Sequence, residues 1–440
     1  MKKYCIDFLF FVKILNGFLL CAGLILVSCS KSPELSVSPK EIVFDAYFVE
    51  DQTINISANV AWTIEVLQRS TSNWLTIDTL RGKGDATITL TAIENYAFTG
   101  RSTRILISGQ GTQTDTIRVS QTAGADLAAD VISDPEFLKF CLERFDTKPR
   151  DGKLSMEEVK DVIRMEDIKN RGIVSLAGIE FFRNLRFLDC SKNLLKSLDV
   201  SANKALEKLN CSSNYWLTDL NITGCEELLE LDCSYTAITE IDVSKNVKLK
   251  ILDLFSLGPD QDKPNQEKLS HINVSNNTVL RKLTVSNNQI TNLDISNNPE
   301  LKYLYCNENR LGELAVNANP KLTSLYCGNN QLGTLDISKN VLLDSLYCND
   351  NRLVGLSLNQ NPALVYLSCA RNEIKSLVVG SNTKLKELKC NHNQLTSLNV
   401  TGMPLTQVDV RYNLLPNTGA VSGFSGTWDS PNFLFTPQKN

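Results

Sequence analysis

Tyrosines recur at a fixed spacing in the second half of this sequence, and their chemistry suits ligand recognition. Tyr305, Tyr326 and Tyr347 follow one another at steps of 21 residues, and Tyr303 and Tyr366 fit the same spacing two residues earlier. If these residues lie on adjacent strands, about 4.8 Å apart, their rings form a ladder. Exposed rings bind proteins and sugars, whereas cross-strand ring pairs also stabilise a sheet without any ligand. The sequence leaves both interpretations open.

A second set of residues has a spacing that suits a metal ion. When the segment is aligned on Gly152, Asp151 and Glu158 fall at positions 5 and 12 of a loop that resembles an EF-hand. The resemblance implies a calcium site formed by Asp146, Asp151 and Glu158. Asp146, however, lies one residue too early, and a Lys-Pro pair replaces the ligand at position 3. The alternative is a structural turn between two helices, and no other cofactor is predicted.

Other chemistry has little support in the composition. The chain has two histidines in 440 residues, which argues against histidine-based catalysis and histidine-rich metal sites. Its formal net charge is −4, without a run of Lys and Arg, so nucleic acid is not an expected partner. No Ser-His-Asp or paired-carboxylate arrangement stands out, and we expect a protein without catalytic activity.

The tyrosines belong to a tandem repeat that must position them. Eleven copies of L-x-x-L-x-(C/V/L)-x-x-N begin at Leu185, Leu206, Leu228, Leu249, Leu280, Leu301, Leu322, Leu343, Leu364, Leu385 and Leu405. A fixed period of 20 to 30 residues is typical of a solenoid. The pattern resembles the 21-residue bacterial leucine-rich repeat, LxxLxCxxNxLxxLDVSxN. Each repeat contains two similar halves, which predicts two short strands per coil on opposite walls and little helix.

Three frame positions have predictable roles. Asn residues that follow the strand are expected to bind the backbone of neighbouring turns. Eight cysteines share one position that Leu254, Val285 and Val410 fill in other copies, so the position is a small apolar core position rather than a disulfide or metal site. The Asp of the LDVS half is expected to bond the turn that follows it.

Residues 34–125 differ from the repeat in their pattern. Short runs of β-branched residues are separated by Gly and Asp, which is typical of a β-sandwich. The residues that carry a resemblance to a known domain family are Ala61-Trp62-Thr63-Ile64, Trp74-Leu75-Thr76-Ile77, Gly82-Lys83-Gly84, Asn95, Arg101 and Val119-Ser120-Gln121-Thr122. This segment resembles the BACON domain, a module of Bacteroidetes surface proteins, and the family name implies carbohydrate binding. Strand patterns make Trp62 and Trp74 core residues instead, and the domain a spacer.

The N-terminus resembles a bacterial lipoprotein signal. In residues 1–28, Met1-Lys-Lys leads into an apolar run from Ile14 to Val27, which is typical of a signal peptide, and Leu26-Val27-Ser28-Cys29 resembles a lipobox. The resemblance implies lipidation of Cys29, a short linker at 29–33, and an outer-membrane lipoprotein at the cell surface. Several acyl chains on one cysteine would hold the protein on a membrane.

The predicted architecture is therefore mainly β. After the sandwich, residues 129–184 form a short helical cap, 185–415 a leucine-rich-repeat solenoid of about 11 coils, and 416–440 a C-terminal cap. A ten-residue excess in one repeat predicts a protruding loop at 258–268. The leading function is non-catalytic protein binding or adhesion through the leucine-rich repeat, with an extracellular protein as the partner, and we expect a monomer. The alternative is a glycan-binding component of a polysaccharide uptake system.

Overall fold

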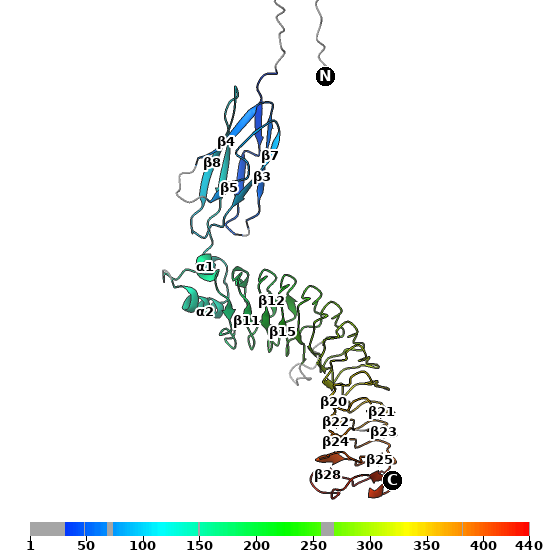
Figure 1. The fold of residues 1–440 in the computed structure, drawn as a ribbon. Coiled ribbons are helices and arrows are strands. Elements are labelled where there is room, and N and C mark those ends of the chain that lie inside the picture. The colour runs from blue at the N-terminus through cyan, green and yellow to red at the C-terminus, as the bar shows by residue number, and fades with distance from the viewer. Residues whose placement is uncertain are drawn as a thin grey trace, which may run out of the picture. The chain divides into compact units, whose positions relative to one another are not determined.

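The computed structural model describes residues 31–47, 49–67, 74–147, 150–256, 268–380 and 382–439. Contacts divide the chain into two compact units. One unit contains the described residues up to Ile93 together with Arg101–Gln121, and the other contains Glu94–Gly100 and everything from Thr122 onward. Both are built mainly of strands, which confirms the predicted fold class (Figure 1).

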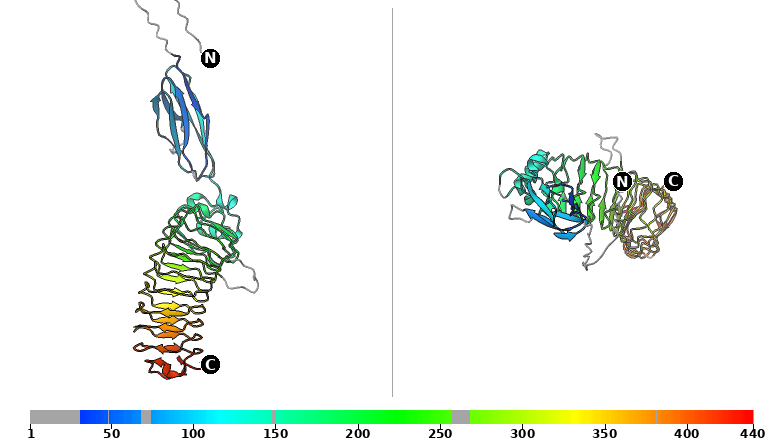
Figure 2. Two further views of the ribbon diagram at one scale, coloured as in Figure 1. Left: turned by 90° about the vertical axis from the view of Figure 1, so that its right-hand side faces the viewer. Right: turned by 90° about the horizontal axis from the view of Figure 1, so that it is seen from above.

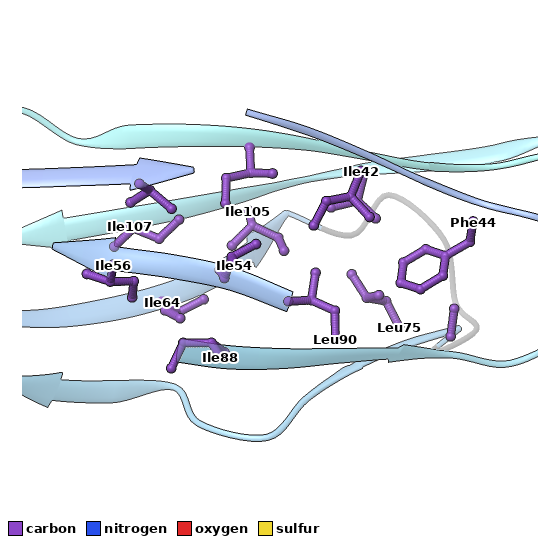
Figure 3. Close-up of a cluster of buried hydrophobic side chains, with 14 of the residues drawn as sticks. Ile42, Phe44, Ile54, Ile56, Ile64, Leu75, Ile88, Leu90, Ile105 and Ile107 are labelled. Carbon is purple, nitrogen blue, oxygen red and sulfur yellow. The ribbon is translucent and has the colours of Figure 1, made fainter. Parts of the chain in front are cut away.

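The first unit is a sandwich of two sheets. One has the order β1-β3-β7-β5 and the other β2-β9-β8-β4-β6. The strands are β1 Leu35–Ser38, β2 Glu41–Phe44, β3 Gln52–Ala58, β4 Ala61–Leu67, β5 Leu75–Ile77, β6 Arg81–Lys83, β7 Ala86–Ala92, β8 Arg101–Gly109 and β9 Asp115–Gln121. Alternate residues of each strand are buried, because successive side chains point to opposite faces. Figure 3 shows Ile54, Ile88 and Ile105 among the side chains gathered in this core.

Both tryptophans of the sandwich are core residues. Trp62 and Trp74 are each 2% exposed. The indole N–H of Trp62 donates to the carbonyl of Gly84 at 2.9 Å, and the guanidinium of Arg101 lies 5.0 Å from the Trp74 ring centroid. The prediction that these rings pack inside is confirmed, and neither is available to stack on a sugar.

Short helices precede the repeat in the second unit. They are α1 Leu127–Asp130, α2 Pro135–Phe145, α3 Met156–Val159 and the 3-10 helix η1 Ile179–Phe181. Asp134 caps α2 by accepting the N–H groups of Glu136 and Phe137, and its other oxygen accepts from Val174 and Ser175. At the other end of the helix, the rings of Phe145 and Phe182 lie 5.4 Å apart. The helix thereby packs on the residues that enter the first coil.

One continuous parallel sheet forms a wall of the solenoid (Figure 2). Its members, in spatial order, are β10 Arg164–Met165, β11 Phe187–Asp189, β13 Lys208–Asn210, β15 Glu230–Asp232, β16 Ile251–Asp253, β17 Lys282–Thr284, β18 Tyr303–Tyr305, β19 Ser324–Tyr326, β20 Ser345–Tyr347, β22 Tyr366–Ser368, β24 Glu387–Lys389, β26 Gln407–Asp409 and β28 Phe433–Leu434. The central Leu of each repeat strand is buried, and its two neighbours face outward. We call this wall the strand wall.

The opposite wall is less regular than the two-strand prediction. Paired strands occur there in three places, as β12 Ser197–Asp199 with β14 Asp219–Asn221, β21 Gly355–Ser357 with β23 Ser376–Val378, and β25 Leu398–Asn399 with β27 Val421–Ser422. In the other described coils the second half-repeat makes turns without a strand. The residues after Leu415 were predicted as a cap, and they add a further coil, since β27 and β28 extend both walls.

Two ladders of asparagine hold the coils together. The first ladder consists of the asparagines that follow the strands of the strand wall. Each uses both the nitrogen and the oxygen of its side-chain amide: Asn330 donates to the carbonyls of Cys306 and Cys327, and its oxygen accepts from Leu311 N–H. This confirms the predicted role. Members of the second ladder, such as Asn340, donate to two carbonyls of the preceding coil. Cys225 occupies an asparagine position of this second ladder, where its thiol donates to the carbonyl of Val200 at 3.2 Å.

A residue in the left-handed region precedes each first-ladder asparagine. These residues have φ between 52° and 60°, and they are Lys192, Ser213, Asn287, Glu308, Asn329, Asp350, Arg371, His392 and Tyr412. The conformation costs a non-glycine residue about 1–2 kcal/mol. Hydrogen bonds between coils offset this conformational cost. The N–H of Glu308, for example, donates to the carbonyl of Gly328 in the next coil at 2.9 Å.

Candidate binding face

Four adjacent strands place five tyrosines on the outer side of the strand wall. We call Tyr303, Tyr305, Tyr326, Tyr347 and Tyr366 the tyrosine face. They lie on β18, β19, β20 and β22, where alternation with a buried Leu turns them outward. The register pairs Tyr305 with Tyr326 and Tyr326 with Tyr347, so the predicted ladder is present.

The ladder rings cover one another. The ring centroids of Tyr305 and Tyr326 lie 4.9 Å apart at an interplanar angle of 54°, and those of Tyr326 and Tyr347 lie 4.2 Å apart at 21°. Tyr326 therefore has a neighbouring ring on each side. A sugar platform requires a free ring face, which Tyr326 does not offer.

The other two tyrosines of the tyrosine face occupy the outward position two residues before the ladder position. Tyr303 and Tyr366 are 41% and 37% exposed, and the register places Ser324 and Ser345 between them. Three strand spacings separate the two tyrosines, or about 14 Å. Two small serines, rather than further rings, therefore separate Tyr303 from Tyr366 in the sheet. Rigid aromatic groups around small polar residues are typical of binding hot spots.

Two phenols of the ladder, those of Tyr305 and Tyr347, stay protonated at neutral pH. Burial, together with a hydrogen bond shared with Tyr326, raises the pKa of Tyr347 to about 12. Burial also raises the pKa of Tyr305. Both groups are therefore hydrogen-bond donors over the physiological range. Asp344 supplies acceptor capacity beside them, and it accepts the hydroxyl of Ser345 at 2.6 Å.

The carboxylates of the EF-hand-like segment bond to the backbone of their own loop. Asp146 accepts N–H groups of Asp151 and Gly152 at 3.3 and 2.9 Å, and Glu158 accepts from Thr147 N–H and from Ser155. The described part of the chain contains no group of three or more metal-ligating side chains. These bonds favour the structural turn, and calcium binding at Asp146, Asp151 and Glu158 stays a prediction that nothing here tests.

Adding calcium distinguishes the two interpretations. We expect about 1 mM Ca²⁺ to shift the melting temperature of EDTA-treated protein by less than about 1 °C, because the carboxylates already serve the turn. An occupied site of micromolar affinity would raise it by several degrees. A rise with Ca²⁺ but not with Mg²⁺ that disappears in Asp151→Asn would establish the site.

The cysteines line the core and do not form a chemical site. All ten described cysteines are buried and free, and Cys211 and Cys233 are in sulfur contact at 3.5 Å. Burial raises the pKa of Cys327 to about 12, which keeps the thiol protonated and unreactive. This confirms that the shared position is an apolar core position.

The acidic positions on the strand wall serve local turns. Asp189 and Asp232 each accept the backbone N–H two residues later, and so do Asp199 and Asp336 on the opposite wall. The prediction that the LDVS aspartates bond their own turns is confirmed. Their carboxylates are therefore engaged within the protein.

Several predicted features lie outside the described residues. These are the signal peptide, Cys29 and the inserted loop except for Lys268, whose ammonium donates to the Asn287 side chain at 2.7 Å. Within the described ranges, no helix has both the length and the apolar character needed to span a membrane.

Comparison with known proteins identifies both parts of the chain. Residues 60–122 match the BACON family model, described as "Putative binding domain, N-terminal". The functional domain of InlJ from Listeria monocytogenes, described as including a cysteine ladder, has a TM-score of 0.57 and 28% identity. The match covers 64% of this chain and 62% of that one, so the chain spans less than two thirds of that structure. A search of curated proteins finds no match.

A second internalin shows the same fold. InlF of Listeria monocytogenes has a TM-score of 0.51 and 19% identity, with coverage of 68% of this chain and 92% of that one. The chain thus combines a BACON domain with a leucine-rich-repeat solenoid. The description of the BACON model is that of a binding domain, and the similarity of the solenoid to InlJ and InlF is one of fold.

Proposed function

We propose that this protein is a surface-exposed, membrane-anchored lipoprotein whose solenoid binds an extracellular protein through the tyrosine face. The BACON domain would act as a spacer between the anchor and the solenoid. Binding would need no catalysis and no cofactor, and the solenoid would act as a monomer.

The ring geometry carries the choice of a protein partner. Tyr326 is covered by rings on both sides, with centroids 4.9 and 4.2 Å away, so the ladder offers edges and donors rather than free faces. Ring edges and phenol donors fit the carbonyls and side chains of a peptide surface. The buried leucines beneath hold the rings in place, which limits the conformational entropy lost on binding.

Binding is tested with Tyr305→Ala/Tyr326→Ala/Tyr347→Ala. We expect this variant to lose at least about 100-fold in affinity for the protein partner that wild type captures from extracellular or host proteins, because aromatic hot-spot truncations cost about 2 kcal/mol or more each. Affinity would be measured by surface plasmon resonance on the full chain. The matched control is the triple Tyr→Phe variant, which keeps the rings and removes the hydroxyls. Equal affinity in wild type and a cooperatively melting Ala variant would reduce the ladder to scaffold.

A glycan ligand is the second candidate, favoured by Tyr303 and Tyr366. Their rings are the most exposed of the tyrosine face, and no described ring stacks on either of them. Sugar binding on a glycan array that is lost in Tyr303→Ala/Tyr366→Ala but kept in the ladder variant would favour this candidate.

The anchor rests on the sequence around Cys29. We expect cells fed an alkyne-tagged fatty acid to label the wild-type protein and not Cys29→Ala, since the lipobox-like motif places the modified residue there. Externally added protease should then degrade the wild-type protein on intact cells. Labelling of both proteins would reject lipidation at Cys29.

A further inference from the structure

Three basic residues stack at one repeat position beside the tyrosine face. We call Lys250, Arg281 and Lys302 the basic row. Each immediately precedes a strand of the strand wall, and the backbone joins them directly: Arg281 N–H donates to the Lys250 carbonyl and Lys302 N–H to the Arg281 carbonyl, both at 2.8 Å. Their backbones are thus about one strand spacing apart, near 4.8 Å.

Several charges elsewhere on the solenoid pair with opposite charges in an adjacent coil. Examples are Lys208 with Glu230 at 2.6 Å and Lys282 with Asp253 at 3.3 Å. Among the described residues, no carboxylate forms an ion pair with any member of the basic row. Stacked like charges repel one another across a sheet. A bound anion would relieve that repulsion.

A carboxylate that interacts electrostatically with the basic row already has another partner. Glu300 accepts a hydrogen bond from the Lys321 ammonium, which is the main cause of its lowered pKa, and the charges of Arg281 and Lys302 act in the same direction. Lys321 thus balances Glu300, and the positive charge of the basic row remains in excess.

The basic row is continuous with the tyrosine face. Lys302 directly precedes Tyr303, and Lys282, next to Arg281, lies with its ammonium 5.8 Å from the Tyr305 ring centroid. Two coils beyond Lys302, the same repeat position holds Asp344. The face therefore has a basic end and an acidic end, which can fix the direction in which a partner lies along the solenoid.

We infer that the basic row and Tyr303 form one docking surface for an acidic segment of the protein partner. The inference rests on the proposed function and names the chemistry of the partner. Glutamate or aspartate side chains on an extended segment would reach the three cations, while the rest of the segment lies on the tyrosine edges. An anionic polysaccharide fits the adjacent ladder less well, because its central ring, Tyr326, has a neighbouring ring on each side.

The test uses fluorescein-labelled decaglutamate and the full chain. We expect Lys250→Gln/Arg281→Gln/Lys302→Gln to lower the affinity measured by fluorescence anisotropy by about 10-fold or more, and higher salt to weaken the wild-type complex. The control, Lys245→Gln/Lys339→Gln/Lys375→Gln, removes three exposed cations that are not stacked, and it should bind like wild type. The melting temperature should not fall in the basic-row variant, since like charges are removed.

Each other result overturns the inference. Equal binding by both variants, or no binding of decaglutamate to wild type, would show that the basic row is not an acidic-peptide site. Heparin binding that depends on the basic row, without decaglutamate binding, would assign the surface to an anionic glycan. These failures leave the tyrosine-dependent capture of a protein partner intact. Failure of the proposed function would instead be seen as partner capture that survives loss of the tyrosine ladder.

Discussion

Raising the pH above 9 is expected to unfold the solenoid within about one to two pH units. Burial raises the pKa of seven thiols of the shared core position, to about 12 for Cys327 and Cys369 and well upward for Cys190, Cys233, Cys306, Cys348 and Cys390. In the unfolded chain each thiol ionises near pH 8.5. Between the two values only the unfolded state has lost its proton, so stability falls as the pH rises.

The expected effect is large because the thiols act together. Each contributes a loss of about 1.4 kcal/mol per pH unit, or about 10 kcal/mol per unit for seven, against a typical stability of about 5–15 kcal/mol. Far-UV circular dichroism against pH, in the presence of a reducing agent, measures the midpoint. Below pH 8 the thiols should also resist iodoacetamide.

A matched variant isolates the contribution of the thiols. Val occupies the same position in two coils, as Val285 and Val410, so Cys306→Val/Cys327→Val/Cys348→Val should keep the packing. With three fewer thiols, its unfolding midpoint should rise by about half a pH unit or more. Identical midpoints would show that other groups govern alkaline unfolding.

Removing one first-ladder asparagine is expected to destabilise the solenoid by about 3–4 kcal/mol. In Asn330→Ala the buried N–H of Leu311 loses its acceptor, and two hydrogen bonds to the carbonyls of Cys306 and Cys327 are also lost, although each carbonyl keeps a second asparagine donor. A buried polar group without a partner costs about 1–3 kcal/mol. Chemical denaturation followed by circular dichroism measures the loss.

The second ladder supplies the control for this prediction. Asn340→Ala removes two hydrogen bonds, to Val316 and Asn319, and the side-chain oxygen of Asn340 accepts none in the described structure. We expect a smaller loss, about 2 kcal/mol. A loss as large at Asn340 as at Asn330 would show that the amide oxygen contributes nothing to the first ladder.

Much of the fold could be predicted from the repeat pattern because every coil must bury and hydrogen-bond the same positions. A Leu that recurs at one position must be buried in every coil, and an Asn that follows the strand must serve the same turn. The burial of Trp62 and Trp74 was likewise predictable from strand alternation. Features that break the frame were not: Cys225 stands where the second ladder uses Asn, and the residues after Leu415 add a coil without its leucines.

The left-handed residues show a second limit of the sequence. The position before the ladder asparagine holds Asn or Asp, which adopt this conformation readily, in three coils, but Lys, Ser, Glu, Arg, His or Tyr in the other six, so residue type gives only a weak signal. The conformation is imposed by the turn and by hydrogen bonds to the next coil. Similarly, sequence separations of 31 and 21 residues concealed the basic row, which stacking brings together.

The sequence by itself determined the repeat, its buried leucines and cysteines, and the row of tyrosines, because period and side-chain alternation depend only on local geometry. Only the tertiary structure decided how the tyrosine rings tilt, which charges find partners, and where the opposite wall forms strands. Those outcomes depend on distances between side chains of different coils. The repeat pattern does not predict them, because it fixes the inward residues of every coil and leaves the outward residues free to differ. The candidate binding face is made of those outward residues, so its geometry follows from the stacking.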